Sequence, residues 1–311
     1  MNRTILPILL NPASGSGAGS RRREALEAAL GRAGVPYRLI VTENEAHLRR
    51  ETRRLAEAGG TIVGAGGDST FAIMANEIMA AGAKVRMGMI GLGSSNDIPR
   101  ELGAPGLDAA CRALAGGRTR RWDVGTVAED ASIVGYFLGQ ANIGLGAAVN
   151  RYVAAAAARR PALARRQSLA GFLGILQSYR KKLVPLEVRV EAEGFSFSGP
   201  LTIAVFANSR FWATGKMIAP QARPDDGILD ACLIGPLPIR RLVRINALAK
   251  SGRHAGRAEV RLTRAESFVL SSDTPFAVQM DGEIAGGAAS PRLFPRLAFG
   301  LRRAALEVLV P

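Results

Sequence analysis

The sequence predicts a two-domain protein: an α/β domain with a parallel sheet, followed by a β-rich domain that is antiparallel and sandwich-like. Up to residue 124, short apolar strands alternate with amphipathic helices, which is the pattern of β-loop-α units around a parallel sheet. From residue 125 onward, strand candidates crowd together with few helices between them. We therefore expect domains at 1–124 and 125–289, with 290–311 as a candidate addition to the first domain.

The elements of the first domain follow in order along the chain. Ser20 is placed to cap the first helix, and Gly59 with Gly60 ends the second. Each strand runs into a polar or glycine-rich loop, and open α/β sheets bind ligands at that carboxyl edge. The expected strands are 4–10, 37–41, 61–63 and 87–90, with helices after Ser20, at 45–58 and at 71–81.

The second domain is predicted mainly from β-type runs. Its expected helices are 154–182 and 239–249. A last apolar run, 304–310, is a candidate strand that returns to the first domain. The expected strands are 134–138, 186–193, 201–206, 229–234, 268–270 and 276–280.

Composition is that of a globular cytoplasmic protein. Of the 311 residues, 48% are apolar and 22% are charged. No run reaches the roughly 18 apolar residues of a membrane span, and no apolar region of a signal peptide follows Met1. Cys111 and Cys232 are too few for a disulfide framework, which fits a reducing compartment.

The formal net charge of +15 favours an anionic partner, which leaves nucleic acid, a membrane surface or a phosphorylated substrate. Aromatic residues make up only 5% and do not alternate with basic ones, so we expect no nucleic-acid partner. Genome-wide bias toward Arg and Ala is an equally good explanation of the charge.

Two scattered histidines, His47 and His254, are too few for a histidine-rich metal site. Acid–base chemistry must then fall to carboxylates. A metal, if used, should be a hard cation on oxygen ligands, Mg²⁺ above all.

Three glycine-rich loops in the first domain carry the main functional signal. We name 11–17, 64–70 and 91–97 the first, second and third glycine loops. Glycine lets backbone N–H groups approach phosphate oxygens, and a following helix N-terminus adds partial positive charge. A single such loop is commonly only a tight turn, but each of these also carries specific polar residues: Asn11 and Ser14, Asp68 and Thr70, Asn96 and Asp97.

With these motifs the chain resembles, over nearly its whole length, the diacylglycerol kinase catalytic family, which includes sphingosine and ceramide kinases. Residues 66–70 resemble the family's GGDGT signature, and 92–97 resemble its LGTxND loop. The order and spacing of the motifs agree with the family. The other matching motifs are 11–15, the first nucleotide loop, 122–125, the strand leaving the first domain, 224–230, the DGxLD element, and 281–283, the DGE motif.

The resemblance implies an ATP-dependent, Mg²⁺-dependent lipid kinase whose active site lies in the cleft between the domains. ATP would bind at the glycine loops and at the end of the second strand. The residues implied for ATP binding are Asn11, Pro12, Ser14, Gly15, Thr42, Gly66, Gly67, Asp68, Ser69, Thr70, Ser94 and Asn96.

The resemblance also implies two metal sites. Asp68, Asp97 and Asp123 would form an acidic network around the catalytic Mg²⁺. A structural Mg²⁺ would use the Asp226 carboxylate with the carbonyls of Arg223 and Ile228. Each motif also has an ordinary interpretation, because Asp225–Gly227 fits a turn between strands and Asp123 fits a strand-end cap.

The general base is open among three carboxylates. Glu283 is our first choice, and Asp281 in the same motif is the second, although Asp281-Gly282 also fits a hairpin turn. Related sphingosine kinases point instead to the aspartate at the position of Asp68.

Ser69 departs from the family, because the signature has glycine at its position. A serine would be strained there if the backbone needs a positive φ, and otherwise its hydroxyl could contact a phosphate. The alternatives to a lipid kinase are an NAD kinase-like enzyme and a catalytically impaired nucleotide- or lipid-binding protein.

Segment 159–182 has basic ends and an apolar middle, which suits peripheral contact with the anionic inner membrane surface. A packed helix with a solvated basic face explains it equally well. The expected partner is a lipid substrate, whose identity stays open among diacylglycerol, phosphatidylglycerol, a sphingoid base and ceramide, and a homodimer is compatible with the sequence.

Overall fold

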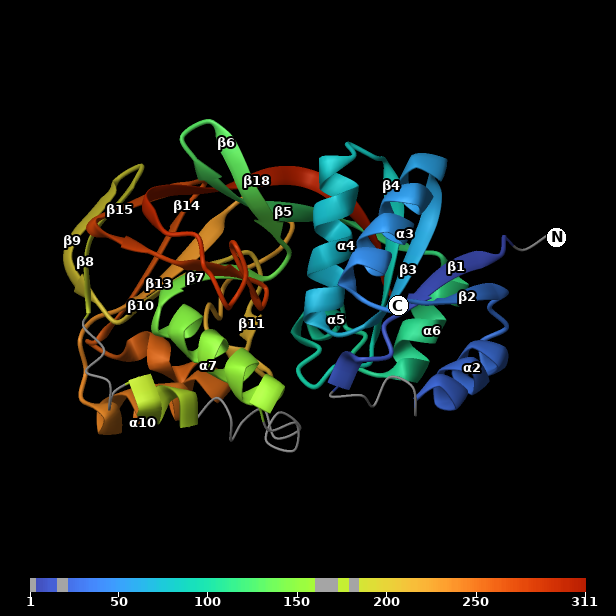
Figure 1. Ribbon diagram of the computed structural model, residues 1–311, viewed down its shortest axis with the longest axis horizontal. Helices are drawn as coiled ribbons and strands as arrows, with labels where there is room; N and C mark the ends of the chain where they lie inside the picture. The colour runs from blue at the N-terminus through green and yellow to red at the C-terminus, as the bar shows by residue number, and fades with distance from the viewer. Residues whose placement is uncertain (1–3, 16–21, 160–172, 179–184) are drawn as a thin grey trace. The chain divides into compact units, whose positions relative to one another are not determined.

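A computed structural model describes residues 4–15, 22–159, 173–178 and 185–311 (Figure 1). The chain divides into two compact units, one of Met1–Asp123 with Arg303–Pro311 and one of Val124–Arg302. Two paired strands, β5 (Thr119–Glu129) and β18 (Phe294–Leu309), run from one unit into the other. Ser20 and residues 160–172 and 179–184 of the basic segment lie outside the described residues.

The first unit is built on a parallel sheet, as predicted. Its strand order is β2 (Tyr37–Val41), β1 (Leu6–Leu10), β3 (Gly60–Gly66) and β4 (Val85–Gly91), each pair parallel. The end of β18 continues this sheet, because Glu307 and Val308 pair in parallel with Arg86 and Met87 of β4. The carboxyl ends of β1, β3 and β4 therefore share one edge, and the three glycine loops start there.

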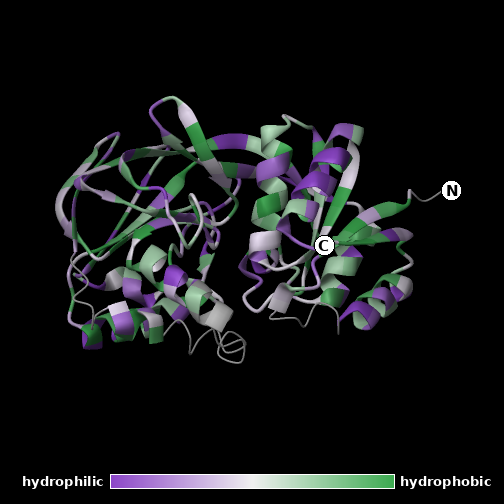
Figure 2. Ribbon diagram, in the orientation of Figure 1, coloured by the Kyte–Doolittle hydropathy of each residue, from purple (hydrophilic) through white to green (hydrophobic). Residues whose placement is uncertain are grey.

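Helices cover both faces of this sheet. Successive residues of a strand point to opposite faces, so each strand contributes side chains to both layers of helices. On one face, Val63 and Ala65 pack with α2 (Arg23–Arg32) and α6 (Leu107–Gly116). On the other lie α3 (Glu45–Ala58) and α4 (Asp68–Ala80), where a Cβ on Gly64 would lie 2.6 Å from the Met74 sulfur. Figure 2 shows hydrophobic residues along the strands and hydrophilic residues on α3.

The second unit is an antiparallel sandwich, as predicted. Its core lies between two sheets, where the Phe206 ring stacks on that of Phe299 at 3.9 Å. One sheet has the order β14 (Val260–Ala265), β13 (Leu229–Ile234), β10 (Ile203–Ala207), β7 (Gln140–Gly144), β16 (Val278–Met280) and β17 (Glu283–Ile284). The other is formed by β9 (Phe195–Leu201), β8 (Leu186–Ala192), β15 (Phe268–Phe276), the first part of β18, β5 and β6 (Ser132–Phe137).

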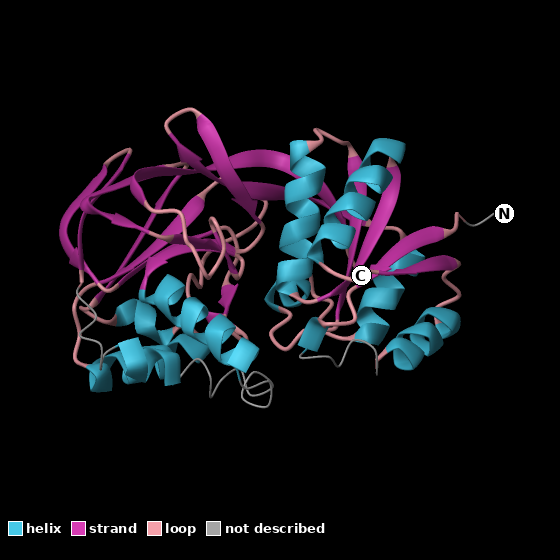
Figure 3. Ribbon diagram, in the orientation of Figure 1, coloured by secondary structure: helices cyan, strands magenta, loops and turns pink. Residues whose placement is uncertain are grey.

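Helices cover the outer face of the sheet that contains β10. Figure 3 shows α7 (Leu145–Arg159) and α10 (Ile239–Leu248) lying together there, and Leu145, Val205 and Ile245 share one cluster. The helix α7 begins at Leu145 rather than at the predicted Ala154, because Gly144, with φ 76°, turns the chain directly from β7 into the helix. Two short 3₁₀ turns, Ala249–Ser251 and Arg253–Gly256, follow α10. A small ribbon pairs β11 (Phe211–Trp212) with β12 (Lys216–Met217), and in the first unit a short helix, α5 (Asp97–Glu101), follows the third glycine loop.

Within the part of the chain that the structure describes, no helix is both long and apolar enough to span a membrane. Both cysteines are buried free thiols.

Candidate active site

The first and second glycine loops are tied together by side chains. Asn11 Nδ2 donates to Thr70 Oγ1 at 3.0 Å, and Ser14 Oγ accepts from the Gly67 amide at 3.2 Å. Asn11 also holds its own turn, because its Oδ1 accepts from the Ala13 amide at 3.1 Å. The polar residues that the sequence placed in separate loops therefore meet.

The second and third loops touch through their backbones. A Cβ on Gly93 would lie 2.7 Å from the Gly67 Cα, and a Cβ on Gly66 would lie 2.4 Å from Thr70 Oγ1. The Leu92 amide also donates to the Gly66 carbonyl at 2.6 Å. Glycine at position 93 therefore lets the second and third loops approach each other, and glycine at position 66 leaves room for Thr70 within the second loop.

Asn96 shapes the third loop. Its φ of 51° is left-handed, a conformation that Asn tolerates better than most residues. Its side chain bonds both backbone groups of Gly93, accepting from the N–H at 2.9 Å and donating to the carbonyl at 3.1 Å. The first role of Asn96 is thus to build the loop.

Asp68 and Asp97 lie beside each other at the junction of the second and third loops. Asp68 is the first residue of α4, and its carboxylate accepts from the amides of Asp97 at 3.1 Å and Ile98 at 3.0 Å. Burial, with the nearby charge of Asp97 second, raises the pKa of Asp68 to about 6. The surroundings of the pair therefore disfavour two negative charges together and favour an added cation.

This pair fits a hard divalent cation, because it offers carboxylate oxygens and a charge imbalance that such an ion would relieve. Asp68 and Asp97 are the residues that would hold it. Among the described residues, no group of three or more His, Cys, Asp or Glu side chains gathers closely enough to form a complete metal site. Other ligands would have to come from water or from a bound phosphate, as is usual for Mg²⁺.

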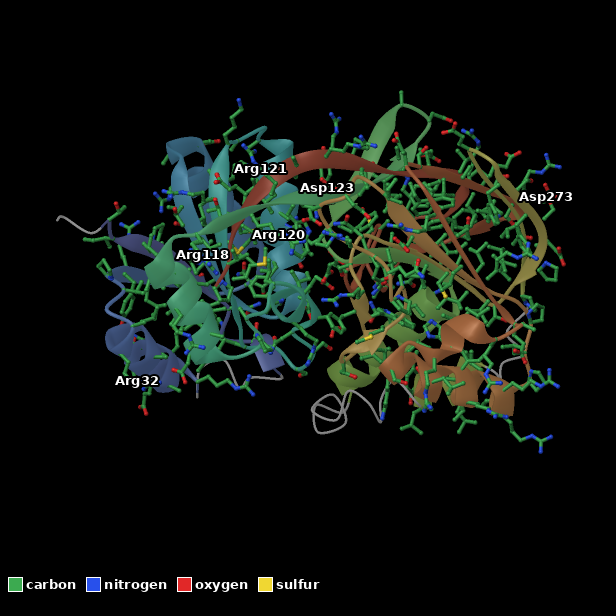
Figure 4. The ribbon with its side chains drawn as sticks, turned by 180° about the vertical axis from the view of Figure 1, so that it is seen from behind. Arg32, Arg118, Arg120, Arg121, Asp123 and Asp273 are labelled. Atoms are coloured by element: carbon green, nitrogen blue, oxygen red, sulfur yellow. The ribbon has the colours of Figure 1, made fainter. Side chains whose placement is uncertain are left out.

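Asp123 is not brought to that pair. It lies on β5, labelled in Figure 4, where its Oδ1 accepts from the Ala304 amide at 2.6 Å. Because β18 runs parallel to β4 with Glu307 beside Arg86, Ala304 lies toward the amino end of the sheet. Asp68 and Asp97 follow the carboxyl ends of the strands. Asp123 instead supports the left-handed turn of Ala304, whose φ is 49°.

The remaining residues expected to bind ATP lie at the carboxyl edge. Thr42 is buried just after β2, and its Oγ1 donates to the Leu10 carbonyl at 3.0 Å, tying β2 to β1. Ser94 is exposed in the third loop. Pro12 and Gly15 lie in the first loop, where Gly15 adopts a φ of 62°.

Sequence reasoning missed Arg22. Its Nη1 donates to the Leu92 carbonyl at 2.9 Å, which places a guanidinium beside the third glycine loop. The signal was present as the run 21–23 of arginines, which we treated only as the start of a helix.

The turn Asp281-Gly282-Glu283 of the second unit holds two carboxylates in different surroundings. Asp281 is buried with φ 45° and accepts from three consecutive amides, those of Leu138 at 2.5 Å, Gly139 at 3.0 Å and Gln140 at 2.8 Å. Asn150 of α7 donates to the Gly282 carbonyl. Glu283 is exposed at the start of β17. Asp281 therefore anchors the turn, and Glu283 is the carboxylate that an incoming group can reach.

The residues expected to hold a structural Mg²⁺ share one turn before β13. Asp226 already has protein donors on both oxygens, the Ile228 amide at 3.1 Å and the Arg264 guanidinium at 2.6 Å. Arg223 extends from this turn and lies 3.6 Å from Asp225.

Two family models match consecutive parts of the chain. Residues 6–127 match the diacylglycerol kinase catalytic domain, and residues 139–301 match the YegS C-terminal NAD kinase beta sandwich-like domain. The chain belongs to the diacylglycerol kinase catalytic family of lipid kinases. The predicted family is thus confirmed. The name of the second model likens only the sandwich domain, residues 139–301, to NAD kinases.

Named relatives of this kinase span both units. It is 30% identical over 295 residues to a diacylglycerol kinase of Mycobacterium tuberculosis, covering 91% of this chain and 92% of that one. It is 25% identical to a diacylglycerol kinase of Staphylococcus haemolyticus, covering 91% of this chain and 83% of that one. A crystal structure of a diacylglycerol kinase from Bacillus anthracis has the same fold, with a TM-score of 0.71 at 15% identity. The match covers 100% of this chain and 98% of that one.

Ser69 of the kinase is not strained. It lies in the first turn of α4, which begins at Asp68 rather than at the predicted Phe71, and its φ is not positive. The backbone therefore accepts serine in place of the family glycine. This removes the strain argument for a catalytically impaired protein.

Proposed function

We propose that this kinase transfers the γ-phosphoryl group of ATP to a lipid hydroxyl, with Mg²⁺ as its metal and the nucleotide bound at the three glycine loops. The observation that carries the proposal is the meeting of three glycine loops around Asp68 and Asp97 at the N-terminus of a long helix. Phosphoryl transfer needs mainly positioning and neutralisation of phosphate charge, and this arrangement is suited to both.

The nucleotide phosphates would bind over the glycine loops. The helix α4 spans Asp68–Ala80, and its N-terminus adds partial positive charge to the loop amides. Arg22 adds a full positive charge at the third loop. Asn11 and Ser14, bonded to Thr70 and Gly67, would keep the first two loops in register for one ligand.

Asp68 and Asp97 would hold Mg²⁺. When bound, such an ion neutralises charge on the transferred phosphoryl group. Before it binds, burial and then the nearby charge of Asp97 raise the pKa of Asp68. Two aspartates held this close are therefore better explained by an added cation than by stability.

Glu283 is the proposed general base. In the transfer, the lipid hydroxyl oxygen bonds to the γ-phosphorus, the bond to the β–γ bridging oxygen of ATP breaks, and the hydroxyl proton passes to a Glu283 oxygen. Asp281 would hold the turn and leave Glu283 exposed, since its own carboxylate is occupied by three backbone amides.

The acceptor is proposed to be a lipid because the relatives are named diacylglycerol kinases. The net charge of +15 favours an anionic lipid surface. Peripheral membrane contact through segment 159–182, cytoplasmic location and a homodimer stay predictions.

Radiolabelled phosphate transfer from ATP to a lipid panel in mixed micelles tests the proposal. The panel holds diacylglycerol, phosphatidylglycerol, sphingosine and ceramide, with NAD as a parallel acceptor. We expect labelling of at least one lipid, abolished by EDTA and by Asp68→Ala. Labelling of NAD alone, or ATP binding with no transfer to any acceptor, would contradict it.

A further inference from the structure

Two acidic residues, Asp226 in the turn before β13 and Asp230 on β13 itself, share one cation from the neighbouring strand β14. Arg264 Nη2 lies 2.6 Å from Asp226 Oδ2, and Arg264 Nε lies 3.3 Å from Asp230 Oδ2. The Arg264 side chain is 41% exposed, and those of Asp226 and Asp230 are 25% and 8% exposed, so the ion pair is shielded from solvent mainly at its Asp230 end. One guanidinium thus links the turn to the strand that follows it.

The strand register places Arg264 at this position. β13 pairs antiparallel with β14, and Asp230 lies directly opposite Arg264. Opposed residues project from the same face, and an arginine is long enough to pass its partner and reach the turn. Its planar fork can bond two carboxylates at once, which a lysine ammonium does less well.

The residues of this turn do not fit the structural Mg²⁺ that the resemblance implied. Asp226 Oδ1 accepts from the Ile228 amide at 3.1 Å, which closes the turn on itself, and Oδ2 is bonded to Arg264. Mg²⁺ demands near-octahedral oxygen ligands at roughly 2.0–2.1 Å. Asp68 also accepts on both oxygens, but from neutral amides and beside a second carboxylate. The Asp226 carboxylate is instead neutralised by the Arg264 guanidinium, which would repel a divalent ion.

We propose that Arg264 replaces a structural metal in this protein: its guanidinium ties the turn at 224–228 to β13, so the turn needs no ion there. The role concerns the stability of the turn and is independent of the proposed phosphoryl transfer. It leaves the metal of the Asp68–Asp97 pair as the only one that we propose for this chain.

Hydrogen–deuterium exchange of the whole protein, read on peptides covering 223–232, tests this in EDTA and in Mg²⁺ without nucleotide. The local readout separates this turn from metal binding at Asp68. In the wild type we expect the same exchange in both conditions. In Arg264→Gln we expect at least about tenfold faster exchange in EDTA, because the carboxylates lose their cation, and slower exchange when Mg²⁺ is added.

Arg241→Gln is the matched control, because Arg241 pairs with Glu259 at 3.4 Å outside the turn. It should leave exchange at 223–232 unchanged. Wild-type exchange that rises about tenfold in EDTA and recovers in Mg²⁺ would overturn the proposal, and so would an Arg264→Gln turn as protected as the wild type. If Arg264→Gln does not fold, the wild-type comparison of EDTA with Mg²⁺ still decides whether the turn needs a metal. Arg264→Lys then tests the role of the guanidinium, and we expect less protection of 223–232 from exchange than in the wild type.

Discussion

Asp68 in the first unit and Asp281 in the second are both buried carboxylates that accept backbone amides, yet their surroundings differ in kind. Asp68 accepts from the amides of Asp97 and Ile98 and faces the charge of Asp97. Asp281 accepts from three amides in a row, and Asn150 holds the carbonyl of the next residue. The first carboxylate is left in need of a cation and the second is satisfied. The same residue type therefore serves as a proposed metal ligand in one unit and as an anchor in the other.

The largest expected effect is on turnover when Asp68 becomes asparagine. We expect phosphate transfer to fall by about 10³-fold or more, about 4 kcal/mol of barrier, because the proposed metal loses a charged ligand. Thermal unfolding should stay within a few degrees of the wild type, since the substitution also relieves the repulsion from Asp97. The assay is phosphate transfer beside differential scanning fluorimetry. Near-normal turnover would remove Asp68 from the site.

Asp281→Asn should instead lower stability. Hydrogen bonds to a charged group contribute roughly 1.5–3 kcal/mol each. The uncharged side chain of asparagine has one oxygen to accept from the three backbone amides, so it replaces the carboxylate only in part. We expect a loss of about 2–4 kcal/mol in the free energy of unfolding, measured by urea denaturation. Asp68→Asn is the matched comparison. If the two variants were equally stable, the contrast between the carboxylates would fail.

A smaller effect links Mg²⁺ to pH. The pKa of Asp68 is raised to about 6 from 3.8, so the metal-free folded chain binds the extra proton and loses stability as pH rises from about 4 to 6. Mg²⁺ competes with that proton. The Mg²⁺-induced rise in melting temperature should therefore be larger at pH 7.5 than at pH 5, and this increment should vanish in Asp68→Asn. An equal rise at both pH values would contradict the assignment.

The smallest effect is expected for Ser69→Gly. Glycine lowers helix stability by about 1 kcal/mol or less at a first-turn position, and no backbone strain is relieved. Turnover should stay within about threefold of the wild type. A tenfold loss would mean that the hydroxyl contacts a phosphate, and a tenfold gain would revive the idea that serine impairs the enzyme.

The sequence by itself determined the fold class, the family and the loops of the first unit. Strand and helix periodicities are set by neighbouring residues, and the motifs at 66–70 and 92–97 lie next to the strands that position them. The pairing of Asp68 with Asp97 could be predicted for the same reason, because both follow the carboxyl ends of adjacent parallel strands.

Only the tertiary structure decided which carboxylates already have partners. Asp123 bonds Ala304, Asp281 bonds the amides from Leu138 to Gln140, and Arg264 bonds Asp226. In each case the partners are far apart in sequence and are brought together by strand pairing or by the loop at a strand end. A shift of one residue in pairing would turn such a side chain to the opposite face of its sheet. Motif spacing does not contain that register, so the roles of these residues could be derived only from the folded chain.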